Sequence, residues 1–142
     1  MRELIHRRGV RQFVKFGLVG VSSTVIDWGI YLALTRIFGI FYLMAKILSF
    51  SVALFNSYTW NRRWTFRSQD SAKLRQFIKF LTISIVGVVL NSFIMYLAVE
   101  HFYFHDIYGL FLASAIVMIW NFLANKFYTF RNSELWIARL KV

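Results

Sequence analysis

The stretch that decides the fold is Asn61-Arg62-Arg63-Trp64-Thr65-Phe66-Arg67, which returns 64 residues later as Asn125-Lys126-Phe127-Tyr128-Thr129-Phe130-Arg131. The same offset, without a gap, carries Arg11-Gln12-Phe13-Val14-Lys15-Phe16 onto Arg75-Gln76-Phe77-Ile78-Lys79-Phe80. Two long apolar stretches lie between these markers in each copy, and a period of this length fits a duplicated hairpin of two helices. The sequence therefore predicts a single domain over residues 1–142, with one repeat at 11–67 and a second at 75–131.

The composition is that of a membrane protein. Hydrophobic residues make up 58% of the 142, whereas soluble domains are roughly 45–50% apolar. Residues 80–99 carry no charge, and about 20 such residues cross a hydrocarbon core of ~30 Å. The first apolar stretch, at 16–34, exceeds the ~7–15 residues of a signal-peptide core and is repeated internally. We expect an all-α integral membrane protein, a bundle of four transmembrane helices.

The basic residues predict the orientation in the membrane. Of the 17 Lys and Arg residues, 15 lie before the first apolar stretch, between the repeats or after the last stretch, and only Arg36 and Lys46 lie elsewhere. Positive segments stay in the cytoplasm, so both termini should be cytoplasmic and the two repeats oriented alike. Lys46 interrupts the second apolar stretch, and its long stem could reach the nearer interface. The expected location is the cell membrane, the inner one where there are two, of a bacterium or archaeon, crossed several times.

Several classes of function are disfavoured by the residues. The net charge of +11 comes from residues that flank apolar spans among aromatic side chains, as in an interfacial belt, so we expect no nucleic-acid partner. The chain has no cysteine, and we interpret His101 and His105 as part of a solvated loop rather than a zinc site. Nothing resembles a nucleophile and base pair. We therefore expect no metal, no cofactor and no enzymatic activity.

Polar residues within the first apolar stretch of each repeat share one helix face. Gly20, Ser23 and Asp27 are three and four residues apart, and the second repeat has Ser84, Gly87 and Asn91. Hydrocarbon would leave such groups without hydrogen bonds, so we expect the two faces to meet inside the bundle. Two interpretations of Asp27 remain open. It exchanges a proton or cation during transport, or it is a neutral structural group bonded to Asn91 or to a tyrosine such as Tyr31.

A second polar face precedes each basic ending. Ser57 and Asn61 are four residues apart, as are Asn121 and Asn125, and these faces open onto Arg62 and Lys126. Amides and cations beside aromatic walls would suit a phosphate that carries an apolar chain. The alternative is that these cations only fix the topology of the chain.

The duplicated endings, together with Phe13-Val14-Lys15-Phe16 and Gly20, resemble the GtrA-like family of small four-helix membrane proteins, over residues 11–131. The resemblance implies a part in moving polyprenyl-phosphate-linked sugars across the membrane, or in assisting the glycosyltransferase that makes them, for synthesis of surface polysaccharides. It also implies such an enzyme as a partner. The second copy departs from the family pattern, because Phe127 and Tyr128 replace a basic residue and Trp.

We expect this chain to take part in flipping a polyprenyl-phosphate-linked sugar. Four helices enclose little volume, so a homo-oligomer or a partner is expected. The alternatives are a scaffold or activator of a glycosyltransferase, and a proton-coupled exporter of small cations that uses Asp27. The residues expected to bind lipid phosphate and sugar are Asn61, Arg62, Arg63, Asn125, Lys126, Lys15 and Lys79, and those expected to form an intramembrane polar path are Asp27, Asn91, Ser23, Ser57 and Asn121. Arginine grips a phosphate through several donors, so the first copy should dominate binding.

Overall fold

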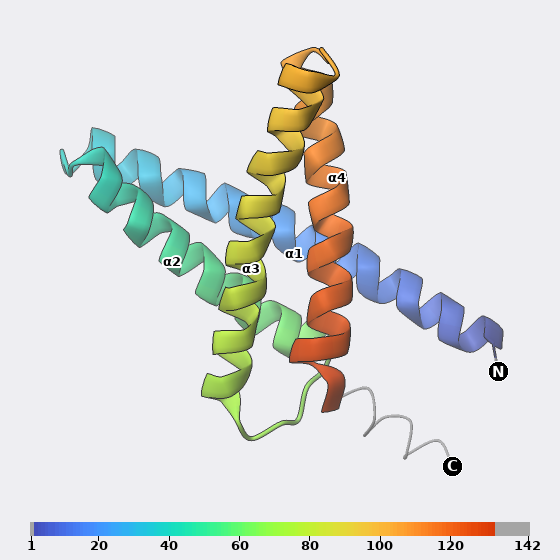
Figure 1. Cartoon of the computed structure of the whole chain (residues 1–142). Coiled ribbons are helices and arrows are strands. Elements are labelled where there is room, and N and C mark those ends of the chain that lie inside the picture. Colours follow the sequence, from blue (N-terminus) through green and yellow to red (C-terminus); the bar gives the residue numbers. More distant parts are fainter. Residues whose placement is uncertain (1, 133–142) are drawn as a thin grey trace. The chain divides into compact units, whose positions relative to one another are not determined.

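A computed structural model describes residues 2–132, and this range contains four α-helices and no strand (Figure 1). The helices are α1 (Arg2–Arg36), α2 (Tyr42–Trp60), α3 (Lys73–Tyr96) and α4 (Asp106–Ala124). Short π-helices continue three of them: η1 (Asn61–Thr65) after α2, η2 (Leu97–His101) after α3 and η3 (Asn125–Thr129) after α4. The prediction of an all-α membrane bundle is confirmed. The offset of 64 also relates α2 to α4 and η1 to η3 residue by residue.

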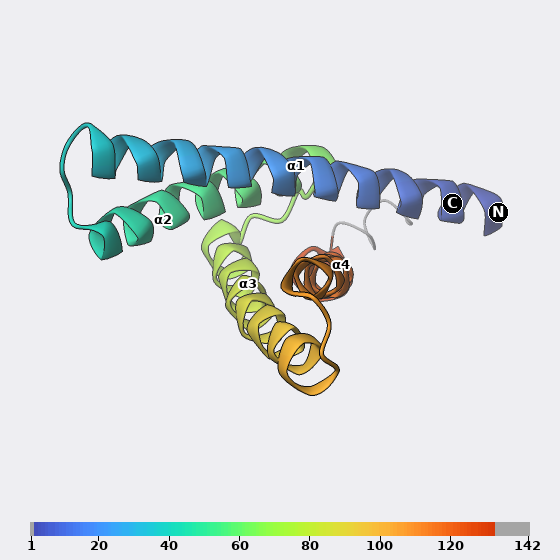
Figure 2. The same ribbon diagram turned by 90° about the horizontal axis from the view of Figure 1, so that it is seen from above.

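The chain divides into two compact units, Met1–Ser68 and Gln69–Val142. In the first, α1 packs against α2 and η1, and in the second, α3 packs against α4 and η3. Each unit is a helical hairpin, which Figure 2 shows from above. The unit boundary lies between the two repeats predicted from the sequence. The expected meeting of the Asp27 and Asn91 faces stays a prediction.

Three helical segments in the described range are long and apolar enough to cross a membrane: Arg7–Arg36, Lys73–His101 and Ile107–Thr129. Helix α2 is not among them, although its 19 residues rise about 28 Å, close to the thickness of the hydrocarbon core. The reason lies in its polar side chains, which include Lys46, Ser49, Ser51, Asn56, Ser57 and Thr59. Of the four expected transmembrane helices in the described range, three are therefore long and apolar enough to cross a membrane by themselves.

The outward faces of the helices are apolar. Val25 and Trp28 on α1 are each 66% exposed, and Phe111 on α4 is 71% exposed. Soluble proteins of this size rarely expose so much contiguous apolar surface to water. These faces are suited to contact with lipid tails.

The same aromatic pair forms the core at one end of each hairpin. The rings of Phe16 and Phe66 meet edge to face with their centroids 6.3 Å apart, and those of Phe80 and Phe130 do so at 6.4 Å. Phe66 and Phe130 are fully buried. Such a contact adds about 0.5–1.5 kcal/mol to the stabilisation from burial. Each pair ties the start of a hairpin to its end.

The turn at the other end is also duplicated. The Ile40 amide donates to the Leu34 carbonyl at 2.9 Å, and the Phe104 amide donates to the Ala98 carbonyl at 2.9 Å. The residue before each donor is left-handed, and this residue is Gly39 (φ 62°) in the first unit and Tyr103 (φ 55°) in the second. The second turn therefore holds a bulky residue in a conformation that glycine adopts more easily.

Candidate functional site

The π-helices place a buried amide at the end of each hairpin. The carbonyl of Asn61 accepts the amide of Phe66, five residues on, at 2.9 Å, and Asn125 and Phe130 repeat this bond at the same distance. Both asparagines are 1% exposed. π-Helical turns often occur at functional sites. Here they widen the last turn so that the residues that follow it turn back toward the first helix of the hairpin.

The buried amides hold their own turn together. The Asn125 Nδ2 donates to the Asn121 carbonyl at 2.8 Å, while its Oδ1 accepts the Thr129 hydroxyl at 2.9 Å. In the first unit the Asn61 Nδ2 donates to the Ser57 hydroxyl at 3.3 Å. Asn125 is thus satisfied within its own turn, whereas the Oδ1 of Asn61 is buried without a hydrogen-bond partner. The expectation that the two asparagines contact a ligand stays a prediction.

A lysine from the first helix of each hairpin lies over an aromatic ring of the ending. The Lys15 Nζ is 4.9 Å from the centroid of Trp64, and the Lys79 Nζ is 4.4 Å from that of Tyr128. A cation over a ring face gains about 0.5–1 kcal/mol at exposed sites. The replacement of Trp by Tyr in the second copy therefore keeps the contact.

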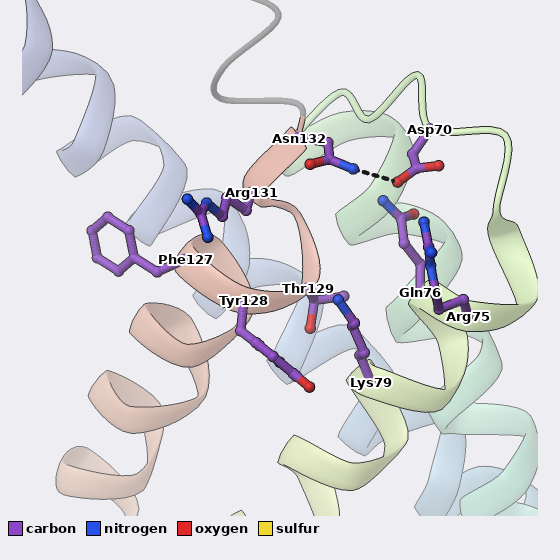
Figure 3. Close-up of a pocket in the computed structure, with 9 residues that line it drawn as sticks. All are labelled: Asp70, Arg75, Gln76, Lys79, Phe127, Tyr128, Thr129, Arg131 and Asn132. Carbon is purple, nitrogen blue, oxygen red and sulfur yellow. Dashed lines mark hydrogen bonds between the residues drawn. The ribbon is translucent and has the colours of Figure 1, made fainter.

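A cavity of about 350 Å³ lies beside this contact in the second unit (Figure 3). The first turns of α3 provide one wall and the segment from Phe127 onward provides the other, with Asp70 at the rim. The Asn132 Nδ2 donates to the Asp70 Oδ2 at 3.0 Å and joins the two walls. The lining residues are Asp70, Arg75, Gln76, Lys79, Phe127, Tyr128, Thr129, Arg131 and Asn132.

The cavity is electropositive, because it has three cations, Arg75, Lys79 and Arg131, and one carboxylate, Asp70. The formal charge is therefore +2, from three positive groups and one negative group. Two of the cations are guanidinium groups, which present several donors in the planar geometry that suits a phosphate. The arrangement is able to bind an anion at the end of the hairpin.

The cations of the cavity are duplicated in the first unit. An offset of 64 carries Arg75, Lys79 and Arg131 back onto Arg11, Lys15 and Arg67. The buried pair Gln76 and Thr129 likewise has its counterpart in Gln12 and Thr65, which are 5% and 4% exposed. Arginines 75 and 131 were not among the residues expected from the sequence, although the repeat that contains them was visible there.

Residues 15–130 match the model of the GtrA/DPMS transmembrane domain, which covers most of both hairpins. The chain belongs to this family. It is also similar to the uncharacterized membrane protein YngA of Bacillus subtilis (strain 168), with 31% identity over 129 residues, or 87% of this chain and 82% of the relative. The resemblance to the GtrA-like family is thereby confirmed.

The structure places the other expected phosphate ligands of this GtrA/DPMS domain outside the cavity. The Lys126 Nζ lies 5.6 Å and 5.8 Å from the ring centroids of Phe122 and Phe127, and Lys126 does not line the cavity. Arg62 is half-buried and Arg63 is exposed, both in η1 of the first unit. The expectation that these two arginines dominate binding stays a prediction, and the cavity lined by Arg75, Lys79 and Arg131 lies in the second unit.

Asp27 has partners that were not expected. Its Oδ2 lies 2.5 Å from the Lys46 Nζ, and its Oδ1 accepts the Ser49 hydroxyl at 2.6 Å. Lys46 therefore points back to α1, and the carboxylate is engaged by α2 rather than by a tyrosine. The reason is the register of the antiparallel hairpin, which sets these three residues side by side. An ion pair also explains how two charges are tolerated between apolar helices.

Two of the remaining residues of the expected polar path, Ser23 and Asn121, lie where the two helices of a hairpin meet. The Asn56 Nδ2 donates to the Ser23 hydroxyl at 3.3 Å, between α2 and α1. In the second unit Asn121 lies against Gly87, between α4 and α3. Asn91 on α3 is half-buried. Among the residues that the structure describes, no three His, Asp or Glu side chains gather as metal ligands would.

Proposed function

We propose that this GtrA/DPMS domain binds the phosphate of a polyprenyl-phosphate-linked sugar at the basic end of its hairpins and takes part in moving that lipid across the membrane for surface polysaccharide synthesis. The observation that carries the proposal is the cavity formed by Arg75, Lys79 and Arg131, whose cations recur in the first unit. Membership of the family supports the class of substrate. The proposal is of a transport role without enzymatic activity.

The cavity has the size and chemistry for a head group. Its volume of about 350 Å³ is at the lower end of the ~300–1,000 Å³ of ligand pockets, which suits a phosphate with part of a sugar. The prenyl chain would lie outside it, against the exposed apolar faces of α3 and α4, where Ile78 is 53% and Val89 is 63% exposed. The cations that would bind the phosphate thus lie next to the apolar helix faces that would contact the prenyl chain.

The charge distribution supports a cytoplasmic position for this end. The cations of the cavity belong to the set of 15 that the sequence places on one side, and positive segments remain in the cytoplasm. A lipid made by a cytoplasmic glycosyltransferase would then be bound where it is produced. Such an enzyme is the partner that we propose, and a homo-oligomer would supply the volume that one small bundle lacks.

Two other functions were open from the sequence. An exporter built on Asp27 is disfavoured by the ion pair, because Lys46 already occupies the carboxylate and would have to leave before a cation could bind. A scaffold for a glycosyltransferase would use the same basic end without moving lipid. Reconstituted vesicles distinguish the two remaining functions, since only a flippase transfers a fluorescent polyprenyl-phosphate sugar between leaflets without other proteins.

The experiment that tests the binding site is native mass spectrometry of detergent-purified protein titrated with undecaprenyl phosphate. The variant Arg75→Gln/Lys79→Gln removes two cations of the cavity. Each charge-assisted hydrogen bond contributes roughly 1.5–3 kcal/mol, and 1.4 kcal/mol is tenfold in affinity. We expect binding at the cavity to weaken by about tenfold or more.

The matched control is Lys126→Gln, which removes a cation from the same hairpin but outside the cavity. It should bind like the wild type. Equal affinity of the double variant and the wild type would refute the proposed site. Equal weakening by Lys126→Gln would show that only the overall positive charge matters.

A further inference from the structure

The turn end of the first hairpin carries two adjoining cavities. One, of about 390 Å³, is lined by Trp28, Tyr31, Leu32 and Lys46. The other, of about 270 Å³, is lined by Tyr31, Leu32, Thr35, Arg36, Ile40 and Tyr42. They share Tyr31 and Leu32, so they form one continuous surface with a cation in each part. We refer to it as the turn-end surface.

We propose that the turn-end surface is a second binding site for a phosphate-bearing lipid head group, at the end of the hairpin opposite Lys15 and Arg67. This inference rests on the proposed function and adds to it a site on the other side of the membrane. The sequence supports that location, since Arg36 and Lys46 are the two basic residues, of 17, assigned to the far side.

The charge and exposure of the cations fit an anion. The Lys46 side chain is 51% exposed even though its Nζ is held 2.5 Å from the Asp27 Oδ2, while the Asp27 side chain is only 13% exposed. The carboxylate therefore holds the ammonium from the protein side and leaves its other face open to a ligand. Arg36 is exposed in the last turn of α1. Lys46, Arg36 and Asp27 together carry a formal charge of +1, which favours an anionic phosphate group.

Aromatic walls complete the surface. The Lys46 Nζ lies 5.9 Å from the ring centroid of Tyr31, which belongs to both cavities. Trp28 and Tyr42 lie at the outer parts, and are 66% and 56% exposed. Binding sites for small molecules commonly combine such apolar walls with a few polar groups that fix the orientation of the ligand. Here the polar groups include two cations and the phenol of Tyr31.

The second repeat shows that the fold does not require these residues. At the matching positions it has Glu100 for Arg36, Leu110 for Lys46, and Asn91 for Asp27. The second hairpin nevertheless forms two packed helices with the same turn hydrogen bond and aromatic core, although its first helix ends in the π-helix η2 where α1 remains α-helical. At the opposite end, by contrast, all three cations of the cavity are retained in both copies. The cationic turn-end surface is therefore specific to the first unit and is not explained by the stability of the hairpin.

The test uses two sets of substitutions, the first of which takes its residues from the second repeat. Asp27→Asn/Lys46→Leu removes the ion pair without leaving one charge alone, and Arg36→Gln removes the exposed guanidinium. Full-length protein in detergent is titrated with undecaprenyl phosphate, and the number of bound lipids is counted by native mass spectrometry. We expect the triple variant to bind one lipid fewer than the wild type, whether or not the cavity variant Arg75→Gln/Lys79→Gln is also present. Circular dichroism checks that the helices of the triple variant are retained. If that variant does not fold, Arg36→Gln alone, at an exposed helix end, replaces it in the test and should weaken binding at the turn-end surface.

Two further ligands identify what is recognised. Undecaprenol lacks the phosphate, so its binding should not change in the triple variant; an equal loss would show a groove for prenyl chains and overturn the proposal. Inorganic phosphate that displaces the turn-end lipid at equal concentration would assign the site to free anions instead of lipid. An unchanged lipid count in the triple variant also overturns the inference, and leaves the proposed function intact if the cavity variant still loses its lipid. A cavity variant that loses nothing contradicts the proposed function alone.

Discussion

The Oδ1 of Asn121 lies 2.7 Å from the position that a Cβ atom on Gly87 would take. The asparagine therefore occupies space that only glycine leaves open between α3 and α4. At the matching positions the first hairpin has two serines, Ser23 and Ser57. The second repeat thus has one large and one small residue at these positions, and the first has two of middle size, where Asn56 donates to Ser23 across the hairpin.

This relationship predicts a rescue. Gly87→Ser should overpack the contact and destabilise the protein by about 1–3 kcal/mol. Adding Asn121→Ser recreates the pair of the first repeat and should restore most of the loss, with a coupling of about 0.5–3 kcal/mol. Thermal unfolding in detergent, followed by circular dichroism, measures the four variants of the cycle. A cost of Gly87→Ser that is the same with and without Asn121 would contradict the interpretation.

The Asp27 ion pair predicts an order of stability. Asp27→Leu removes the carboxylate that accepts from the Lys46 ammonium, and leaves the Ser49 hydroxyl with only its longer bond to the Lys46 carbonyl at 3.2 Å. Because Lys46 is half exposed, we expect a cost of about 1–3 kcal/mol, below the ~3–5 kcal/mol for breaking a fully buried pair. Asp27→Asn keeps an acceptor and should cost less. Asp27→Asn/Lys46→Leu should be the most stable of the three.

The same variants separate structure from transport. If Asp27→Asn folds like the wild type yet abolishes transport in vesicles as completely as Asp27→Leu does, the charge of Asp27 is itself required. That result would revive the proton-coupled exporter. Transport that follows the order of stability would instead support a structural role for the ion pair.

The duplicated turn predicts effects of opposite sign at two matching positions. Gly39→Ala forces a Cβ into the left-handed region and should destabilise the first hairpin by about 1 kcal/mol, although no neighbouring atom obstructs it. Tyr103→Gly relieves the same conformation in the second hairpin and should stabilise it by up to about 1 kcal/mol. Thermal unfolding in detergent micelles measures the change in stability of both variants. Without a bilayer, contacts between the exposed tyrosine and lipid do not contribute. Destabilisation by Tyr103→Gly would show that its ring matters more than its backbone.

Topology is predicted by the division of 15 basic residues against two. A reporter fused after Val142 should be active in the cytoplasm, and one inserted near His105 should be active outside it. The control is a fusion in the connection between the units, near Asp70, which should report the cytoplasm. An external signal from the fusion at Val142 would overturn the assignment of the phosphate cavity to the cytoplasmic face.

The sequence was sufficient to predict the hairpins because the offset of 64 is uninterrupted. Phe16 and Phe66 therefore match Phe80 and Phe130, and the two pairs make the same contact. It also contained the cations of the cavity in duplicate. Arg75 and Arg131 were nevertheless missed, because Arg131 comes beside the start of α3 only through the path that the chain takes after the π-helix η3. A π-helical hydrogen bond, between residues five apart, shifts the side chains that follow it relative to their positions in an α-helix. The residue types alone do not predict this bond.

The partners of Asp27 could not be read from the sequence for a related reason. Successive residues of a helix are rotated by about 100°, so a change of one residue in the turn between α1 and α2 would turn Lys46 away from α1. The register of Asp27 against Lys46 and Ser49 is a property of the folded hairpin. Spacing along one helix shows which residues share a face but not what the other helix brings to that face.

The ion pair between α1 and α2 has a consequence for synthesis of the protein. Helix α2 is not among the segments that are long and apolar enough to span by themselves. Its Lys46 lies in the first turns of the helix and adds to the cost of inserting it alone, although by less than the roughly 2.5–3.5 kcal/mol of a charge at a helix centre. Asp27 leaves the ribosome first, and its counter-ion follows 19 residues later. The two helices are therefore expected to enter the bilayer as one unit, with the salt bridge formed before release into lipid. The second hairpin carries no such pair, and each of its helices is apolar enough to leave the translocon by itself.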